Sequence, residues 1–232
     1  MLLSELKSGL SHLFFPVLCE GCKKPLAGSE AVLCIGCEAQ LPETGYHHIP
    51  DNETALRFAG RIPFYYATSF AYFTDDGLLQ HLVHGLKYSN KKDTGTYLGR
   101  LFAKQLTKTE WIKEIDMVIP VPLHKAKEAK RGYNQSTYIA EGISSVTGIP
   151  VNEAILRRNR ETESQTKKSR TERVNNMSGA FGITAPEPLK EKHILLVDDV
   201  LTTGATIESC ALALMEEKSI KISVATIGIA VS

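Results

Sequence analysis

One segment of this chain constrains the fold more than any other. It consists of residues 193–197 (HILLV), then Asp198 and Asp199, then residues 202–206 (TTGAT), with helical spacing over 205–215. A continuous apolar run without alternation is typical of a strand buried on both faces of a parallel sheet. Such a strand delivers the residues that follow it to the edge where open α/β sheets bind ligands. The segment therefore predicts an α/β fold with two carboxylates and a polar turn at that edge.

Strand and helix patterns alternate over most of the remaining chain. They indicate a mainly parallel sheet flanked by helices over about residues 60–232. Residues 63–73 alternate aromatic with small residues, which favours an antiparallel strand pair. The other expected elements are helices at 3–18, 78–86, 98–106 and 138–146, strands at 116–121, 151–157 and 220–230, a connector at 43–60 and a long loop at 159–176.

The turn after the two acids has the composition of an anion site. The first N–H groups of a helix are free to bind a phosphate, and Gly204 allows the backbone to approach it closely. Thr202, Thr203 and Thr206 add hydroxyl donors, whereas the acids suit sugar hydroxyls or a divalent cation. The alternative is a capped helix without a ligand, but capping needs only one such group. The spacing of a Walker loop is absent.

Four of the five cysteines form two CxxC pairs, Cys19 with Cys22 and Cys34 with Cys37, separated by eleven residues. Two such pairs supply the four thiolates of a closed, tetrahedral structural zinc site. A redox role would require one pair at the start of a helix in a thioredoxin-like unit, which the surrounding sequence does not suggest. Cys210 lies within an apolar helical pattern and is expected in the core.

Bulk composition excludes some classes of protein and leaves others open. The net charge of +1 gives no global argument for nucleic-acid binding, although residues 123–173 hold eleven Lys and Arg against six acids. No stretch approaches the roughly 18 apolar residues of a membrane span. The first residues do not read as a signal peptide, and the clustered cysteines favour a metal site over secreted disulfides. We expect a cytoplasmic protein.

The run VDDVLTTGAT over 197–206 resembles the phosphoribosyl pyrophosphate (PRPP) motif of type I phosphoribosyltransferases. The resemblance implies that Asp198 and Asp199 hold the ribose hydroxyls of PRPP, with Mg²⁺ as its companion ion. It also implies that Thr202, Thr203, Gly204, Ala205 and Thr206 hold the 5′-phosphate.

The chain as a whole resembles one branch of that superfamily, the competence protein F (ComF) family of DNA-uptake factors. The matching segments are 84–88 (HGLKY), 119–124 (IPVPLH), 131–136 (RGYNQS), Gln165, 170–173 (RTER), 176–181 and the cysteine pairs. The resemblance implies an N-terminal helix and zinc knuckle at 1–45, a connector and hood-like segment at 46–95, and the phosphoribosyltransferase-like domain at 96–232. One departure is residues 125–130 (KAKEAK), where more arginines are expected and where lysines would bind phosphate less specifically.

In type I phosphoribosyltransferases the loop after the corresponding strand binds pyrophosphate, so the resemblance implies the same role for the basic stretch after the strand at 116–121. Its cationic side chains can donate charge-assisted hydrogen bonds to phosphate oxygens. The alternative is that this stretch is only a solvated charged turn. The candidates are Lys125, Arg131, Gly132, Asn134 and, from an earlier helix, Lys87. Lys87 could equally compensate the dipole of its own helix.

The loop at 159–176 is expected to close over the pyrophosphate through Lys167 and Arg170. The alternative is a disordered basic loop. The predicted catalytic set is therefore Asp198, Asp199, Arg131, Lys167 and Arg170.

Two functions from different classes remain open, together with a PRPP sensor that lacks turnover. One is a DNA-uptake factor that retains PRPP binding, with single-stranded DNA, uptake-machinery proteins and a second copy of the chain as candidate partners. The other is a metabolic phosphoribosyltransferase that transfers ribose 5-phosphate to a nitrogenous base. Aromatic residues such as Tyr65, Tyr66, Phe70, Tyr72 and Phe73 could stack bases of a single strand, although such a run is more often core.

Overall fold

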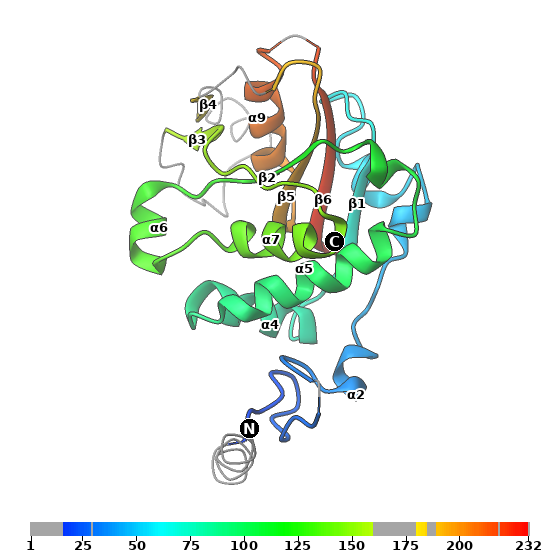
Figure 1. Cartoon of the computed structure of the whole chain (residues 1–232), viewed down its shortest axis with the longest axis vertical. Helices are drawn as coiled ribbons and strands as arrows, with labels where there is room; N and C mark the ends of the chain where they lie inside the picture. Colours follow the sequence, from blue (N-terminus) through cyan, green and yellow to red (C-terminus); the bar gives the residue numbers. More distant parts are fainter. Residues whose placement is uncertain (1–15, 29, 160–179, 185–188, 218, 232) are drawn as a thin grey trace, which may run out of the picture.

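The structure is a computed structural model that describes residues 16–28, 30–159, 180–184, 189–217 and 219–231 (Figure 1). Most of the helix expected at 3–18 therefore lies outside the described residues. Four parallel strands form the central sheet, in the order β1-β6-β5-β2. They are β1 (Ala67–Phe73), β2 (Met117–Pro120), β5 (His193–Leu201) and β6 (Lys221–Ala230). The predicted parallel sheet flanked by helices is confirmed.

Each face of the sheet contributes to a separate hydrophobic core. Leu195 and Val197 of β5 pack with α4 (Leu78–Tyr88), α5 (Lys92–Leu106) and α7 (Gln135–Thr147). Ile194 and Leu196 pack with α9 (Ala205–Leu214) and with residues 55–62. Consecutive residues of a strand point to opposite faces, so a strand covered on both faces has a continuous apolar run, as β5 has from Ile194 to Val197.

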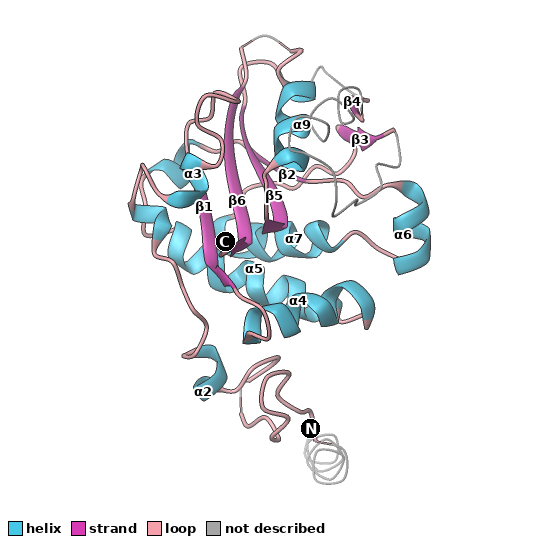
Figure 2. Ribbon diagram, turned by 180° about the vertical axis from the view of Figure 1, so that it is seen from behind, coloured by secondary structure: helices cyan, strands magenta, loops and turns pink. Residues whose placement is uncertain are grey.

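Smaller elements complete the fold (Figure 2). β3 (Leu156–Arg158) and β4 (Phe181–Ile183) form a separate antiparallel pair. The remaining elements are α2 (Ile35–Glu38), η1 (Tyr46–His48), α3 (Glu53–Leu56), η2 (Trp111–Glu114) and α6 (Lys125–Arg131).

Several sequence-based expectations about local structure are wrong. Residues 63–73 form no antiparallel pair, because only β1 is a strand there and it pairs in parallel with β6. The first five residues of β1 are all buried, as in a strand that is covered on both faces. The strand expected at 151–157 is a single bridge from Val151 to Val118 followed by β3, which belongs to the other sheet. The connector at 43–60 contains η1 and α3, and the basic turn is the helix α6. β1 lies in the segment predicted as connector and hood, and it belongs to the main sheet. The division of the chain at residues 45 and 95 stays a prediction.

Two glycines allow α5 and α7 to cross in close contact. A side chain at Gly99 would overlap the carbonyl oxygen of Ile139, and one at Gly142 would overlap the carbonyl oxygen of Thr96. We expect Gly142→Ala to lower the free energy of unfolding by about 2–3 kcal/mol, because backbone atoms cannot give way as a flexible side chain can. Denaturant unfolding measures the loss, and the exposed Glu141→Ala on the same helix is the control. Equal stability of the two variants would contradict the close crossing.

Candidate functional site

The two acids lie inside β5, not after its end as the sequence suggested, because the strand continues to Leu201. Asp199 is buried, with 5% of its surface exposed, and Asp198 is partly buried. The Asp198 Oδ1 atom accepts hydrogen bonds from the Ser136 hydroxyl and from the Asp199 N–H, both at 2.9 Å. Lys87 Nζ lies 2.9 Å from Asp199 Oδ2 and forms an ion pair with it. Ser136 and the ion pair were not predicted from the sequence.

Electrostatics at the pair make one carboxylate hard to ionise. Loss of water around Asp198, followed by the negative charge of Asp199, raises the pKa of Asp198 to about 7. Burial alone would lower the pKa of Lys87, but the facing Asp199 carboxylate outweighs it and leaves that pKa raised. One lysine therefore faces two adjacent carboxylates, an arrangement that favours a ligand able to donate hydrogen bonds or add positive charge.

We expect Asp198→Asn to stabilise the ligand-free protein in a pH-dependent way. The pKa of Asp198 is raised, so the stability contributed by its protonated form is lost as the pH rises from about 4 to about 7. Asparagine removes that loss, so the gain should be about 1–3 kcal/mol at pH 8 and smaller at pH 5.

Thermal unfolding across this pH range measures the effect. Asp116→Asn is the control, because the His193 N–H and Lys192 hold the pKa of Asp116 below its usual value, and its loss should therefore destabilise at pH 8. If Asp198→Asn instead lowered the stability at pH 8, ionisation of Asp198 would not destabilise the folded protein as predicted.

The turn after β5 has the geometry of a helix-start anion site. Gly204 has a φ of +79°, which favours glycine, and α9 begins at the next residue. A side chain on Gly204 would also lie only 2.8 Å from the ring of Phe58, so the glycine is required by packing as well. The Ala205 N–H donates to the Thr203 hydroxyl at 3.5 Å, and the Glu208 N–H donates to the Gly204 carbonyl at 2.9 Å.

Two arginines that the sequence analysis missed contact this turn. Arg57 donates to the carbonyl of Thr202 at 2.8 Å, and Arg61 donates to the carbonyl of Thr203 at 2.9 Å. Arg57 lies in the stretch interpreted as a connector at 43–60, and Arg61 directly follows it. Neither residue belongs to a recognisable motif, so only their positions in the folded chain identify them.

The structure brings only part of the predicted pyrophosphate set to the acids. Arg131 is the last residue of α6, and its guanidinium group lies 5.7 Å from the Tyr88 ring centre. Its positive charge partly offsets the rise in the pKa of Lys87. Gly132, with a φ of +84°, terminates α6. The Asn134 amide donates to the Val121 carbonyl at 3.0 Å and caps α7, so it also holds the turn together.

The remaining predicted residues are not found beside the acids in the described part of the chain. Lys125 lines a separate cavity of about 160 Å³ with Pro120, Asn134 and Glu153, and no contact between it and the acids is found among the described residues. Lys167 and Arg170 lie outside the described residues.

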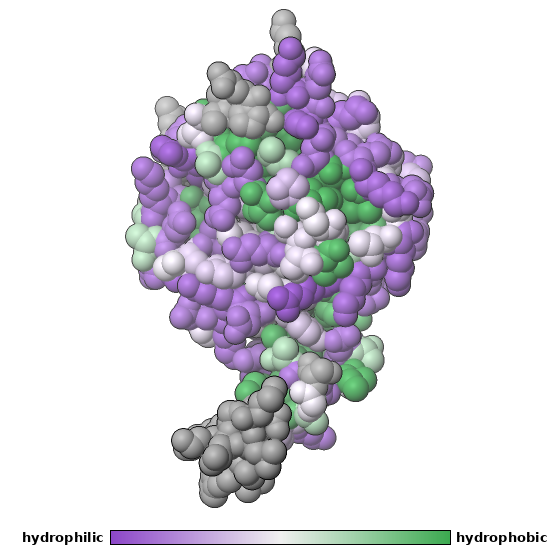
Figure 3. Space-filling view, in the orientation of Figure 1, coloured by the Kyte–Doolittle hydropathy of each residue, from purple (hydrophilic) through white to green (hydrophobic). Residues whose placement is uncertain are grey.

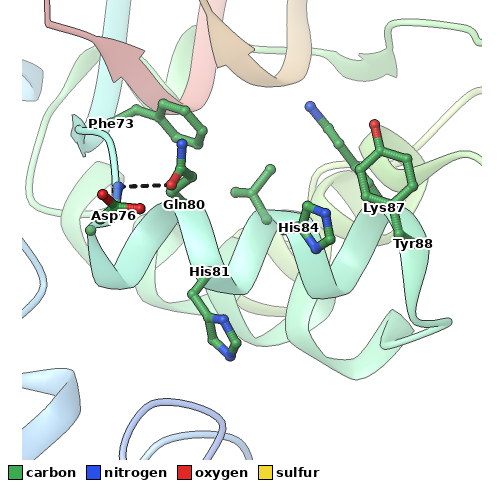
Figure 4. A pocket seen from close by; sticks show the side chains of 9 residues that line it. Phe73, Asp76, Gln80, His81, His84, Lys87 and Tyr88 are labelled. Carbon is green, nitrogen blue, oxygen red and sulfur yellow. Dashed lines mark hydrogen bonds between the residues drawn. The ribbon is translucent and has the colours of Figure 1, made fainter.

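A cavity of about 530 Å³ opens along one side of α4 (Figure 4). Phe73 at the end of β1 and Lys87, Tyr88 and His84 of α4 line it. The His84 and Tyr88 rings lie 4.6 Å apart, and Tyr88 is 69% exposed. Because Lys87 connects the cavity to Asp199, a molecule bound at the acids would have room beside it.

The four clustered cysteines come together as a metal site requires. Their sulfur atoms all lie within 4.8 Å of one another, and Cys22 Sγ is 3.7 Å from Cys34 Sγ. Four thiolates at this separation fit one tetrahedral zinc ion. Cys210 is fully buried in α9, as expected.

The cysteine module, residues 17–41, lies beside α4 and contacts the start of α5 (Figure 1). Glu20 forms an ion pair with Lys91, just before α5, and Tyr97 of α5 donates a hydrogen bond to Glu38. Cys19 and Cys37 belong to the same hydrophobic core as α4 and α5.

The aromatic run considered for base stacking contains one buried residue, Phe70, and three partly buried residues, Tyr66, Tyr72 and Phe73. Phe70 is fully buried, Tyr66 stacks on Trp111 at 4.9 Å, and Tyr72 lies edge-on to Tyr46. Tyr65 is 54% exposed. Charged and polar residues cover much of the visible surface around small apolar areas (Figure 3). No helix in the described ranges is both long and apolar enough to cross a membrane.

Comparison with known proteins agrees with this geometry. The phosphoribosyl transferase domain family matches residues 134–232. DNA utilization protein YhgH of Shigella flexneri is 26% identical over 227 residues, covering 91% of this chain and 96% of that protein. Competence protein F of Haemophilus influenzae is 26% identical over 205 residues, covering 84% of this chain and 89% of that protein. The chain is similar to these relatives over most of its length and to phosphoribosyl transferase domains over residues 134–232.

A third relative, competence protein ComFC of Bacillus subtilis, matches over a shorter range. It is 35% identical over 101 residues, which are 44% of this chain and 39% of that protein. In this chain the matched domain contains the acid pair and the turn after it. Lys87, Arg57 and Arg61 all precede that domain in the sequence.

Proposed function

We propose that this protein belongs to the ComF family, binds PRPP with Mg²⁺ at the carboxyl edge of its sheet and acts in DNA uptake during natural transformation. The observation that carries the proposal is the adjacent acid pair, held by Ser136 and Lys87 next to a turn that opens a helix. The matched phosphoribosyl transferase domain supports PRPP as the ligand. The names of the relatives, which refer to competence and to DNA utilization, support the biological role.

Each part of PRPP has a complementary group in this arrangement. Asp198 and Asp199 accept hydrogen bonds from the two ribose hydroxyls, and residues 202–206 bind the 5′-phosphate. Lys87 and Arg131 bind the pyrophosphate, so Lys87 exchanges part of its contact with Asp199 for phosphate oxygens. Carboxylate oxygens such as those of Asp198 and Asp199 are ligands that Mg²⁺ prefers, so these residues would hold the ion, and it would supply positive charge to balance the phosphates.

Turnover would require the pyrophosphate to leave C1 of the ribose. The developing negative charge on the leaving group is balanced by Lys87, Arg131 and, from the segment outside the described residues, Lys167 and Arg170. No nucleophilic side chain is needed, because bond cleavage at C1 passes through an oxocarbenium-like state. The 530 Å³ cavity next to Lys87 gives a second candidate function, a metabolic transferase that accepts a nitrogenous base.

We further propose that the protein works in the cytoplasm, as a homodimer, and contacts single-stranded DNA and proteins of the uptake machinery. The basic residues between 123 and 173 supply the charge for nucleic-acid phosphates.

Two titrations on the full chain test the proposal. Calorimetry with PRPP, with and without Mg²⁺, should show a site that Mg²⁺ strengthens. Binding of a fluorescent single-stranded DNA should weaken with rising salt, because each neutralised phosphate releases counterions. A product assay with PRPP and a panel of bases separates the two functions: base-dependent pyrophosphate release favours the metabolic transferase. Absence of PRPP binding would overturn both.

A further inference from the structure

Residues 57–61 lie against the outer side of the phosphate-binding turn, far from it in sequence. The Arg57 and Arg61 contacts to Thr202 and Thr203 span 145 and 142 positions. Phe58 packs against Gly204 between them, since a side chain on Gly204 would touch both the Phe58 ring and Arg61. One face of the turn is therefore covered by this segment.

The two arginines fix the orientation of consecutive peptide groups. A trans peptide is planar, so the N–H of each residue points opposite to the carbonyl of the residue before it. No described peptide bond is cis. With the Thr202 and Thr203 carbonyls directed at the guanidinium groups, the N–H groups of Thr203 and Gly204 point away from them, toward the uncovered face of the turn.

The guanidinium groups are themselves held in place. Arg57 also donates to the Ala230 carbonyl at 3.0 Å, at the end of β6, and to Glu53 at 2.7 Å. Arg61 also donates to the Arg57 carbonyl at 2.8 Å and forms an ion pair with Glu208 in the first turn of α9. The Arg61 and Glu208 side chains are only 15% and 9% exposed. Both arginines thus donate their hydrogen bonds to groups within the protein, which makes them positioning residues and not direct ligands.

We infer that Arg57 and Arg61 form a clamp that pre-orients the Thr203 and Gly204 N–H groups to bind the 5′-phosphate. Charged donors on the carbonyls also polarise these peptide groups, which strengthens their N–H groups as donors. Neither effect requires contact between an arginine and the ligand. The inference rests on the proposed function, because it assigns the turn a phosphate to bind.

Lysine is the discriminating substitution, because it keeps the charge and loses the fork that reaches several acceptors at once. We expect Arg57→Lys and Arg61→Lys each to weaken binding of PRPP and of ribose 5-phosphate by about five- to tenfold, the scale of one ordinary hydrogen bond, because neither arginine contacts the ligand itself. Pyrophosphate, which should bind at Lys87 and Arg131, should keep its affinity. In the wild type, ribose 5-phosphate should shift the Thr203 and Gly204 amide signals in nitrogen-edited NMR spectra, and the lysine variants should reduce these shifts.

Two further variants separate the clamp from a simple structural role. Asn52→Ala removes the cap of α3, just before residues 57–61, without changing either arginine. It should lower the melting temperature. The ratio of ribose 5-phosphate affinity to pyrophosphate affinity should stay unchanged. Arg57→Lys does not depend on the buried Arg61–Glu208 pair, so it remains informative if Arg61→Lys unfolds.

The outcomes distinguish the two claims. A wild type that binds neither PRPP nor ribose 5-phosphate contradicts the proposed function. A wild type that binds both, with full affinity and unchanged amide shifts in the folded lysine variants, overturns the clamp alone. Equal losses for ribose 5-phosphate and pyrophosphate also overturn it.

Discussion

Replacing Asp198 and Asp199 together by asparagine should lower the affinity for PRPP by at least tenfold. Each substitution keeps the shape of the side chain and removes an ionised acceptor, and each lost charge-assisted hydrogen bond costs about 1.5–3 kcal/mol. The structure adds a second consequence. Lys87 loses its Asp199 partner, so its ammonium group is left without the anion that it faces in the ligand-free protein.

Calorimetric titration with PRPP and Mg²⁺ measures the loss. Glu216 and Glu217, adjacent acids beyond the end of α9, provide the control, because changing both to glutamine removes the same formal charge away from β5. The control should bind PRPP as the wild type does. Unchanged binding by the asparagine double variant would show that the acid pair is only a polar part of the strand.

Removing zinc should unfold the cysteine module locally. We expect one zinc ion per chain, and the binding energy of a structural zinc ion, about 10–16 kcal/mol in zinc-finger peptides, is largely folding energy of the loops it holds. Chelation, or Cys19→Ser, should increase amide hydrogen exchange over residues 17–41. The central sheet should remain protected, because its two cores contain many side chains beyond the module.

The increase in amide hydrogen exchange should extend a short way into α4 and α5. Glu20 and Glu38 contact Lys91 and Tyr97, so exchange near the junction of α4 and α5 should also rise. Metal analysis gives the stoichiometry, and Cys210→Ala should retain one zinc ion because Cys210 lies in α9. A stably folded module without metal would contradict the zinc assignment.

The sequence predicts the central strand and its ligand edge because the apolar run, the acids and the turn are contiguous. The same holds for the metal site, whose ligands are two short CxxC pairs. Secondary structure without such a signal was missed. α6 has no buried residue, so no apolar periodicity marks it as a helix.

Contacts between distant segments were beyond the reach of local patterns. Arg57 and Arg61 lie in a polar stretch and act more than 140 positions away. Lys87 could be placed on a helix end, but only the folded sheet shows that its partner is Asp199 and that Ser136 contacts Asp198.

The ion pair between Lys87 and Asp199 gives the ligand-free protein an internal counterion. Any cationic or hydroxyl-bearing ligand must compete with a tethered ammonium group whose effective concentration is high and does not change when the protein is diluted. Binding is therefore an exchange reaction: the ligand gains the carboxylate while the lysine is freed for an anion. A ligand with a sugar alone displaces the lysine without giving it a new partner, whereas a ligand with both a sugar and a phosphoanhydride does both. On the proposed function, the pair would therefore favour ligands that carry both a sugar and a phosphoanhydride.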